Sequence, residues 1–168
     1  RDIWATTKVR TYRGDVVNSD YYRKYFVANN LPNVYTAFFY FKQSDLASEL
    51  FAMTEIIFQH WQRFFHRYMP KGKPDWLSGD VAFALAIQLL GIEEQCTREN
   101  IDAVPTFTHM KQHHNNFSSE DWRDACHWTL TDDKIFCVNG YAQTRPFHYF
   151  HKDFCTPELI ARYEHGLQ

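Results

Sequence analysis

The sequence predicts an α/β fold in which helices flank a mixed sheet and a small β-rich part follows. Two patterns support this prediction. Residues 34–41 (VYTAFFYF) are almost continuously apolar, which is typical of a strand buried on both faces inside a sheet. From Ser44 to Tyr68, apolar residues recur every three or four positions, which predicts one long helix with a single buried stripe.

The other elements are expected in chain order from periodicity and from turn and capping residues. A second, deeply buried helix should run from Gly79 to Leu90, with Ser78 as N-cap and Gly91 after its end. The remaining expectations are a strand over 3–11, a short helix within 20–30, a strand over 105–110, a hairpin joining 127–130 to 135–138, a strand over 145–150 and a terminal helix from Thr156.

Length and composition bound the class of protein. The 168 residues fit one domain, 1–168. With 18 basic and 20 acidic residues, no charge surplus indicates a nucleic-acid partner. No apolar run approaches the roughly 20 residues of a membrane-spanning helix. The four cysteines include no C-x-x-C pair, so we interpret them as buried, reduced thiols and expect a cytoplasmic location.

The histidines do not show metal-ligand spacing. H-E-x-x-H and paired-finger patterns are absent from the sequence, and residues 111–116 (KQHHNN) are typical of a polar surface loop. Basic residues such as Arg23 and Lys24 have no glycine-rich loop beside them and are interpreted as solvated. A metal-dependent hydrolase using the histidine-rich segment remains an alternative.

Asp80 is the residue whose position most suggests chemistry. It lies in the first turn of the apolar helix that begins at Gly79. One interpretation is that Asp80 only complements the positive end of that helix. The other is that a buried helix start, with Gly79 permitting close approach, presents the carboxylate to a ligand. The sequence alone leaves both open.

Three segments, in this order, resemble the GT-A nucleotide-sugar glycosyltransferases, especially the glycogenin-like and bacterial galactosyltransferase-like group and its phage-type relatives. Residues 33–44 (NVYTAFFYFKQS) are similar to the strand and helix start that follow the family's acidic metal motif. Residues 75–83 (DWLSGDVAF) are similar to its element in which an acid beside the transferred sugar precedes a buried helix. Residues 147–149 (FHY) are similar to its histidine–aromatic element.

This resemblance implies the C-terminal half of a GT-A fold and a set of site residues. It implies that Asp80 is catalytic, orienting the sugar hydroxyls or acting as base, and that His148 holds Mn²⁺ or Mg²⁺. The substrate-binding residues implied are Asn33, Thr36, Trp76, Gly79 and Lys152. The implied substrates are a nucleotide-diphosphate sugar donor and an unknown acceptor.

The sequence departs from the family at three points. Ala37 stands where a glycine is expected, the lysine-containing segment after the histidine ends early at Lys152, and no D-x-D precedes residue 33. The resemblance therefore implies a missing N-terminal half that supplies the nucleotide pocket, and we expect the chain alone not to transfer sugar. The alternative is a non-catalytic, degenerate transferase-like module that binds or acts as a scaffold in a larger phage or bacterial protein.

Overall fold

The chain forms two compact units. A computed structural model describes residues 2–17, 23–97, 106–111, 114–115, 126–149 and 156–167. Unit 1 comprises Arg1–Lys8 and Asn18–Val104, and unit 2 comprises Val9–Val17 and Pro105–Gln168. Each unit is described by itself, and the single domain expected over 1–168 stays a prediction.

The strands of unit 1 are β1 (Ile3–Thr6) and β3 (Tyr35–Phe41), which pair antiparallel with Ile3 opposite Phe41. The strand expected over 3–11 is interrupted. Its second part is β2 (Val9–Arg10), which belongs to unit 2 and pairs with a different strand. The expected continuous strand is therefore wrong, because the chain passes from one unit to the other after Lys8.

The expected interior position of residues 34–41 is also wrong for the described residues. Among these, β3 pairs with β1 alone. Tyr40 is 56% exposed and Phe41 is 47% exposed, whereas Phe39 packs against Phe51 and Phe83. An unbroken apolar run does not require two covered faces when several of its members are aromatic residues that tolerate partial exposure.

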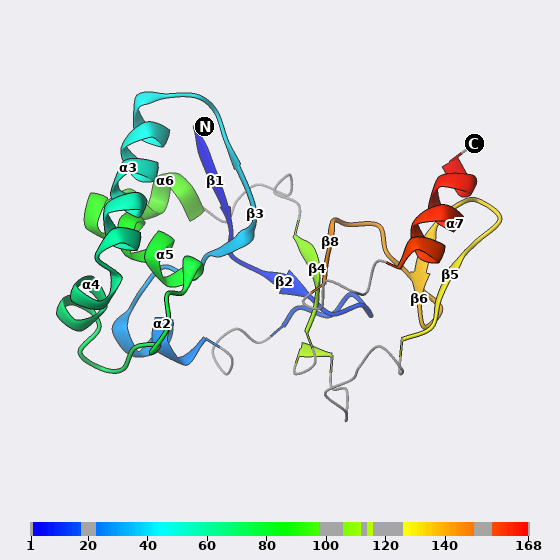
Figure 1. The fold of residues 1–168 in the computed structure, drawn as a ribbon, viewed down its shortest axis with the longest axis horizontal. Coiled ribbons are helices and arrows are strands. Elements are labelled where there is room, and N and C mark those ends of the chain that lie inside the picture. The colour runs from blue at the N-terminus through cyan, green and yellow to red at the C-terminus, as the bar shows by residue number, and fades with distance from the viewer. Residues whose placement is uncertain are drawn as a thin grey trace. The chain divides into compact units, whose positions relative to one another are not determined.

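The long helix expected over 44–68 is two helices, α3 (Asp45–Gln59) and α4 (Trp61–Tyr68), visible one after the other in unit 1 of Figure 1. His60 separates them with φ −128° and ψ 30°, outside the helical range. The break also shifts the buried stripe. Leu50 and Ile57 are buried as expected, but the buried residue of α4 is Phe65 rather than Phe64.

The most apolar helix forms where the sequence predicts it. α5 spans Gly79–Leu90, the Ser78 side chain accepts a hydrogen bond from the Val81 amide, and Gly91 ends the helix with φ 67°. Residues 81–87 are all buried, and α5 packs against α3 and β3. Unit 1 also has, among its described residues, the short helices α2 (Lys24–Asn29) and α6 (Glu93–Thr97).

The described part of unit 2 has two small sheets and a terminal helix. In the first sheet, β2 and β8 (Phe147–Tyr149) pair parallel with β4 (Phe107–Met110). In the second, the expected hairpin of β5 (Trp128–Leu130) and β6 (Phe136–Val138) is confirmed, and β7 (Tyr141–Ala142) extends it. α7 spans Pro157–Leu167. None of the described helices is long and apolar enough to cross a membrane.

Candidate functional site

Asp80 lies where the start of α5 meets the start of β3. Its Oδ1 atom accepts hydrogen bonds from the Thr36 amide at 2.9 Å and from the Thr36 hydroxyl at 2.6 Å. Gly79 is beside this contact, but a Cβ at that position would lie an ordinary 3.6 Å from Thr36 Oγ1. Close approach is therefore not what requires glycine there. Three of the predicted site residues, Thr36, Gly79 and Asp80, are brought together.

Arg23 is the second partner of Asp80 and the residue that the sequence did not reveal. Its Nη1 atom lies 2.7 Å from Asp80 Oδ2, and its Nη2 atom donates to the Val34 carbonyl. The guanidinium is also sandwiched between the rings of Phe26 at 3.8 Å and Tyr35 at 4.1 Å. The interpretation of Arg23 as a solvated residue is wrong, because its side chain is only 9% exposed.

The Asp80 carboxylate is largely satisfied within the protein. A carboxylate offers about four lone-pair positions, and Thr36 and Arg23 together use three. The side chain remains 30% exposed, so one position is open to a donor from solvent or from a ligand. An acid held this way, with its charge matched by Arg23, is suited to orienting a hydroxyl rather than to removing a proton.

Asn33 and Trp76 lie in the same unit as this cluster. Asn33 Nδ2 donates to the Thr7 carbonyl at 3.0 Å, which gives it a role in holding the chain just after β1. Trp76 is 56% exposed, and its ring contacts Tyr25 edge-on at 6.4 Å. Tyr25 belongs to α2, whose N-cap is Arg23. Trp76 is thus an exposed aromatic side chain that contacts α2, the helix whose N-cap Arg23 pairs with Asp80. Lys152 lies outside the described residues.

The resemblance implies that His148 and Asp80 serve one metal–sugar site, but His148 belongs to unit 2 and Asp80 to unit 1, so their approach to each other stays a prediction. Its ring lies 5.0 Å from that of His109, which faces it across the parallel β4–β8 pair, and 5.8 Å from that of Phe107. The His114 ring lies 4.8 Å from His109. Across the part of the chain that the structure describes, no three His, Cys, Asp or Glu side chains are arranged to hold a metal ion. The Mn²⁺ or Mg²⁺ ligand role of His148 also stays a prediction.

Asn115 is a structural residue that the sequence interpretation missed. It was expected in a polar surface loop, yet it is 4% exposed. Its Oδ1 atom accepts from the Tyr12 amide at 2.9 Å, and its Nδ2 atom donates to the His109 and Lys111 carbonyls. Gln143 donates to the Tyr12 carbonyl at 2.8 Å. Two side-chain amides therefore hold the 9–17 segment in unit 2.

The cysteines that the structure describes agree with a structural role. Cys126 and Cys137 are buried and remain thiols, whereas Cys155 lies outside the described residues. Burial raises the pKa of the Cys126 thiol from an ordinary 9.0 to about 11. The low-pKa thiolate of a catalytic cysteine is therefore not found at Cys126.

We expect the alkylation rate of Cys126 to keep rising with pH up to about 11, because only the thiolate reacts. The folded state holds this proton more tightly than the unfolded chain. The resulting stability is fully present below pH 9.0 and is lost as the pH rises through about 11. Iodoacetamide labelling followed by peptide mass spectrometry measures the profile, with the urea-unfolded chain as control. A rate that levels off near pH 9 in the folded protein would contradict the prediction.

No protein-family model matches the chain, and neither the curated proteins nor the solved structures include one that is significantly similar to it.

Proposed function

We propose that this chain is the sugar-side part of a nucleotide-sugar glycosyltransferase, in which Asp80 accepts a hydrogen bond from a hydroxyl of the donor sugar. The observation that carries the proposal is the cluster formed by Asp80, Thr36 and Arg23. It joins two segments that resemble the GT-A family separately, 33–44 and 75–83, at one partly exposed carboxylate. The sheet does not support the GT-A resemblance. That resemblance implies an interior strand at 34–41, whereas among the described residues β3 pairs with β1 alone.

The chemistry required of this chain is to bind and orient a sugar. The exposed Trp76 ring offers a flat face on which a sugar can stack. The open position on Asp80 accepts one hydroxyl, while Arg23 and Thr36 keep the carboxylate from turning. A sugar fixed in this way is aligned for attack by an acceptor hydroxyl. Mn²⁺ or Mg²⁺, when bound in the complete enzyme, would neutralise the departing diphosphate.

A second candidate is the non-catalytic module, and the same cluster favours it. Arg23 and Asp80 neutralise each other, and Thr36 fills most of the remaining acceptor capacity. Such a network also serves as a purely structural link between α2, β3 and α5. The two candidates differ in whether a sugar binds beside Asp80, which can be measured directly.

Saturation-transfer NMR with free hexoses and with UDP- and GDP-hexoses tests this difference. We expect at least one sugar to bind. Trp76→Ala should lower the affinity for that sugar about tenfold, the upper range for loss of one aromatic contact. Asp80→Asn keeps the shape but removes the charge, and should also weaken binding about tenfold. Phe58→Ala, at an exposed aromatic residue of α3, is the matched control and should leave binding unchanged.

The sugar-site proposal would be contradicted, and the structural module favoured, if no sugar binds. The same holds if Phe58→Ala weakens sugar binding as much as Trp76→Ala does. Turnover assays with the same donors, with and without Mn²⁺, separate binding from transfer. Sugar binding without transfer agrees with the expectation that the nucleotide-binding half is also needed.

A further inference from the structure

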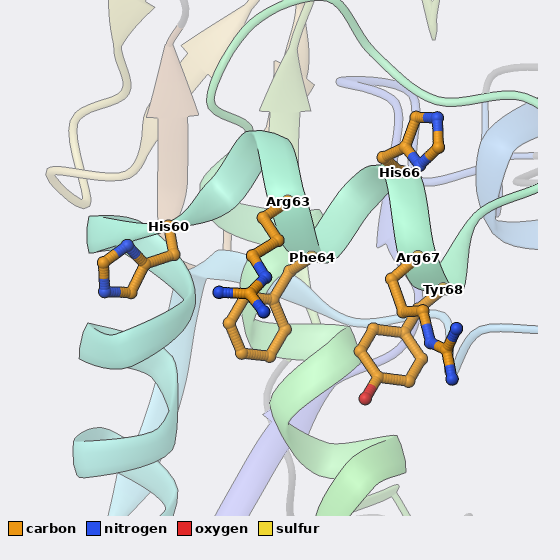
Figure 2. A pocket seen from close by; sticks show the side chains of 6 residues that line it. All are labelled: His60, Arg63, Phe64, His66, Arg67 and Tyr68. Atoms are coloured by element: carbon orange, nitrogen blue, oxygen red, sulfur yellow. The ribbon is translucent and has the colours of Figure 1, made fainter.

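A hollow lies along α4, among the described residues of unit 1. It has a volume of about 620 Å³ and is lined by His60, Arg63, Phe64, His66, Arg67 and Tyr68. Figure 2 shows Arg63, Phe64, Arg67 and Tyr68 extending from the same side of the helix, whereas His66 extends away from them. The volume lies within the range of about 300–1,000 Å³ that is typical of small-molecule sites. We refer to it as the α4 hollow.

The charges in the α4 hollow are all of one sign. Arg63 and Arg67 are four residues apart on α4 and therefore neighbours, an arrangement that costs an isolated helix about 0.2–0.5 kcal/mol. The helix sequence WQRFFHRY contains no acidic residue. Among the residues that the structure describes, neither guanidinium makes an ion pair or a hydrogen bond, in contrast to Arg23. An anion bound from outside would remove the repulsion.

Two aromatic rings form the floor beside these charges. Phe64 and Tyr68 are stacked, with ring centroids 5.9 Å apart and an angle of 30° between the planes. Tyr68 is 41% exposed, so part of this residue is accessible to a ligand. An arginine guanidinium binds phosphoryl oxygens through two parallel hydrogen bonds, and a ring-shaped organic group stacks on an aromatic face. The hollow presents both features within two turns of one helix.

We propose that the α4 hollow binds a small phosphate ester that carries a ring. Arg63 and Arg67 hold the phosphoryl oxygens, and the ring of the ester stacks on Phe64 and Tyr68. This site uses none of the residues around Asp80 and does not depend on the proposed transferase function. A simple phospholipid headgroup offers the phosphate without the ring, so the ring distinguishes the two sources of phosphate.

The test is a calorimetric titration of the chain with phenyl phosphate, with inorganic phosphate and with phosphatidic acid vesicles. We expect saturable binding of phenyl phosphate, about tenfold tighter than inorganic phosphate because of ring stacking. Arg63→Gln/Arg67→Gln should reduce this affinity about 100-fold, since each charge-assisted hydrogen bond contributes about tenfold. Glutamine keeps high helix propensity, so α4 should still form.

Arg145→Gln is the matched control, because Arg145 is exposed in unit 2 and its loss changes the net charge in the same direction. Unchanged affinity in this control supports the site. The proposal is overturned if wild type does not bind phenyl phosphate saturably, or if Arg145→Gln loses as much affinity as the double variant. Equal affinity for inorganic and phenyl phosphate, or tighter binding to the vesicles, overturns the choice of a ring-bearing ester.

Discussion

Replacing Asn115 with alanine is expected to lower the free energy of unfolding of unit 2 by about 3 kcal/mol, the sum of three hydrogen bonds at about 1 kcal/mol each. The largest part of the loss falls on the Tyr12 amide, for which Asn115 Oδ1 is the acceptor in a buried position. The His109 and Lys111 carbonyls lose the Nδ2 donor but keep backbone donors. We expect the 9–17 segment to detach before the rest of unit 2 unfolds.

Urea denaturation gives the change in free energy, and hydrogen exchange of the peptide containing Tyr12 locates it. Thr131→Ala is the control in the same unit, because Thr131 accepts one exposed hydrogen bond from the Ile135 amide and should cost less than about 1 kcal/mol. The Asn115 side chain does not hold the 9–17 segment if Asn115→Ala lowers the free energy of unfolding no more than Thr131→Ala does. The same conclusion follows if hydrogen exchange of the Tyr12 peptide is unchanged.

The sequence predicted the elements that are defined by residues next to one another in the chain, such as helix caps and tight turns. α5 begins and ends where Ser78 and Gly91 place its caps, and the β5–β6 hairpin follows from the turn at 131–134. The turn before β7 could also have been predicted. Asn139-Gly140 is a residue pair typical of hairpin turns, both residues have positive φ, and they join β6 to β7. The break at His60 has no glycine or proline to mark it, and the apolar stripe continues across it. Periodicity alone therefore predicted one helix.

The candidate site was predicted from the sequence only in part. Asp80, Thr36 and Gly79 were expected to serve one site, and they meet. Arg23 was missed because a basic residue shows nothing in the sequence of a partner 57 positions away. Asn115 was missed for a similar reason, since a polar residue in a polar run is typical of a surface, and only the fold shows that it is buried. Long-range pairs of polar groups are decided by tertiary packing, which no local pattern encodes.

Replacing Asp80 with alanine is expected to lower the free energy of unfolding of unit 1 by about 3 kcal/mol. Breaking a buried ion pair from one side costs about 3–5 kcal/mol, and the 30% exposure of Asp80 places this variant at the lower end of that range. The cost arises because Arg23, 9% exposed and enclosed by Phe26 and Tyr35, keeps its charge but loses its carboxylate. The Thr36 amide and hydroxyl lose their acceptor at the same time.

The control for this variant is Asp45→Ala, since Asp45 is an exposed acid in the first turn of α3 that makes no ion pair with an arginine among the residues that the structure describes. It should lose only the interaction with the helix dipole, about 0.3–1 kcal/mol.

A double-mutant cycle of Asp80→Ala with Arg23→Met isolates the contribution of the ion pair, because methionine keeps part of the packing between the Phe26 and Tyr35 rings without the charge. We expect the double variant to be clearly less destabilised than the sum of the two single variants. Additive losses in urea denaturation, together with unchanged hydrogen exchange in α5, would show that the Arg23–Asp80 pair does not link α2 to α5. In that case Asp80 would be held by its helix and by Thr36 alone, and the oxygen now paired with Arg23 would be available to a ligand.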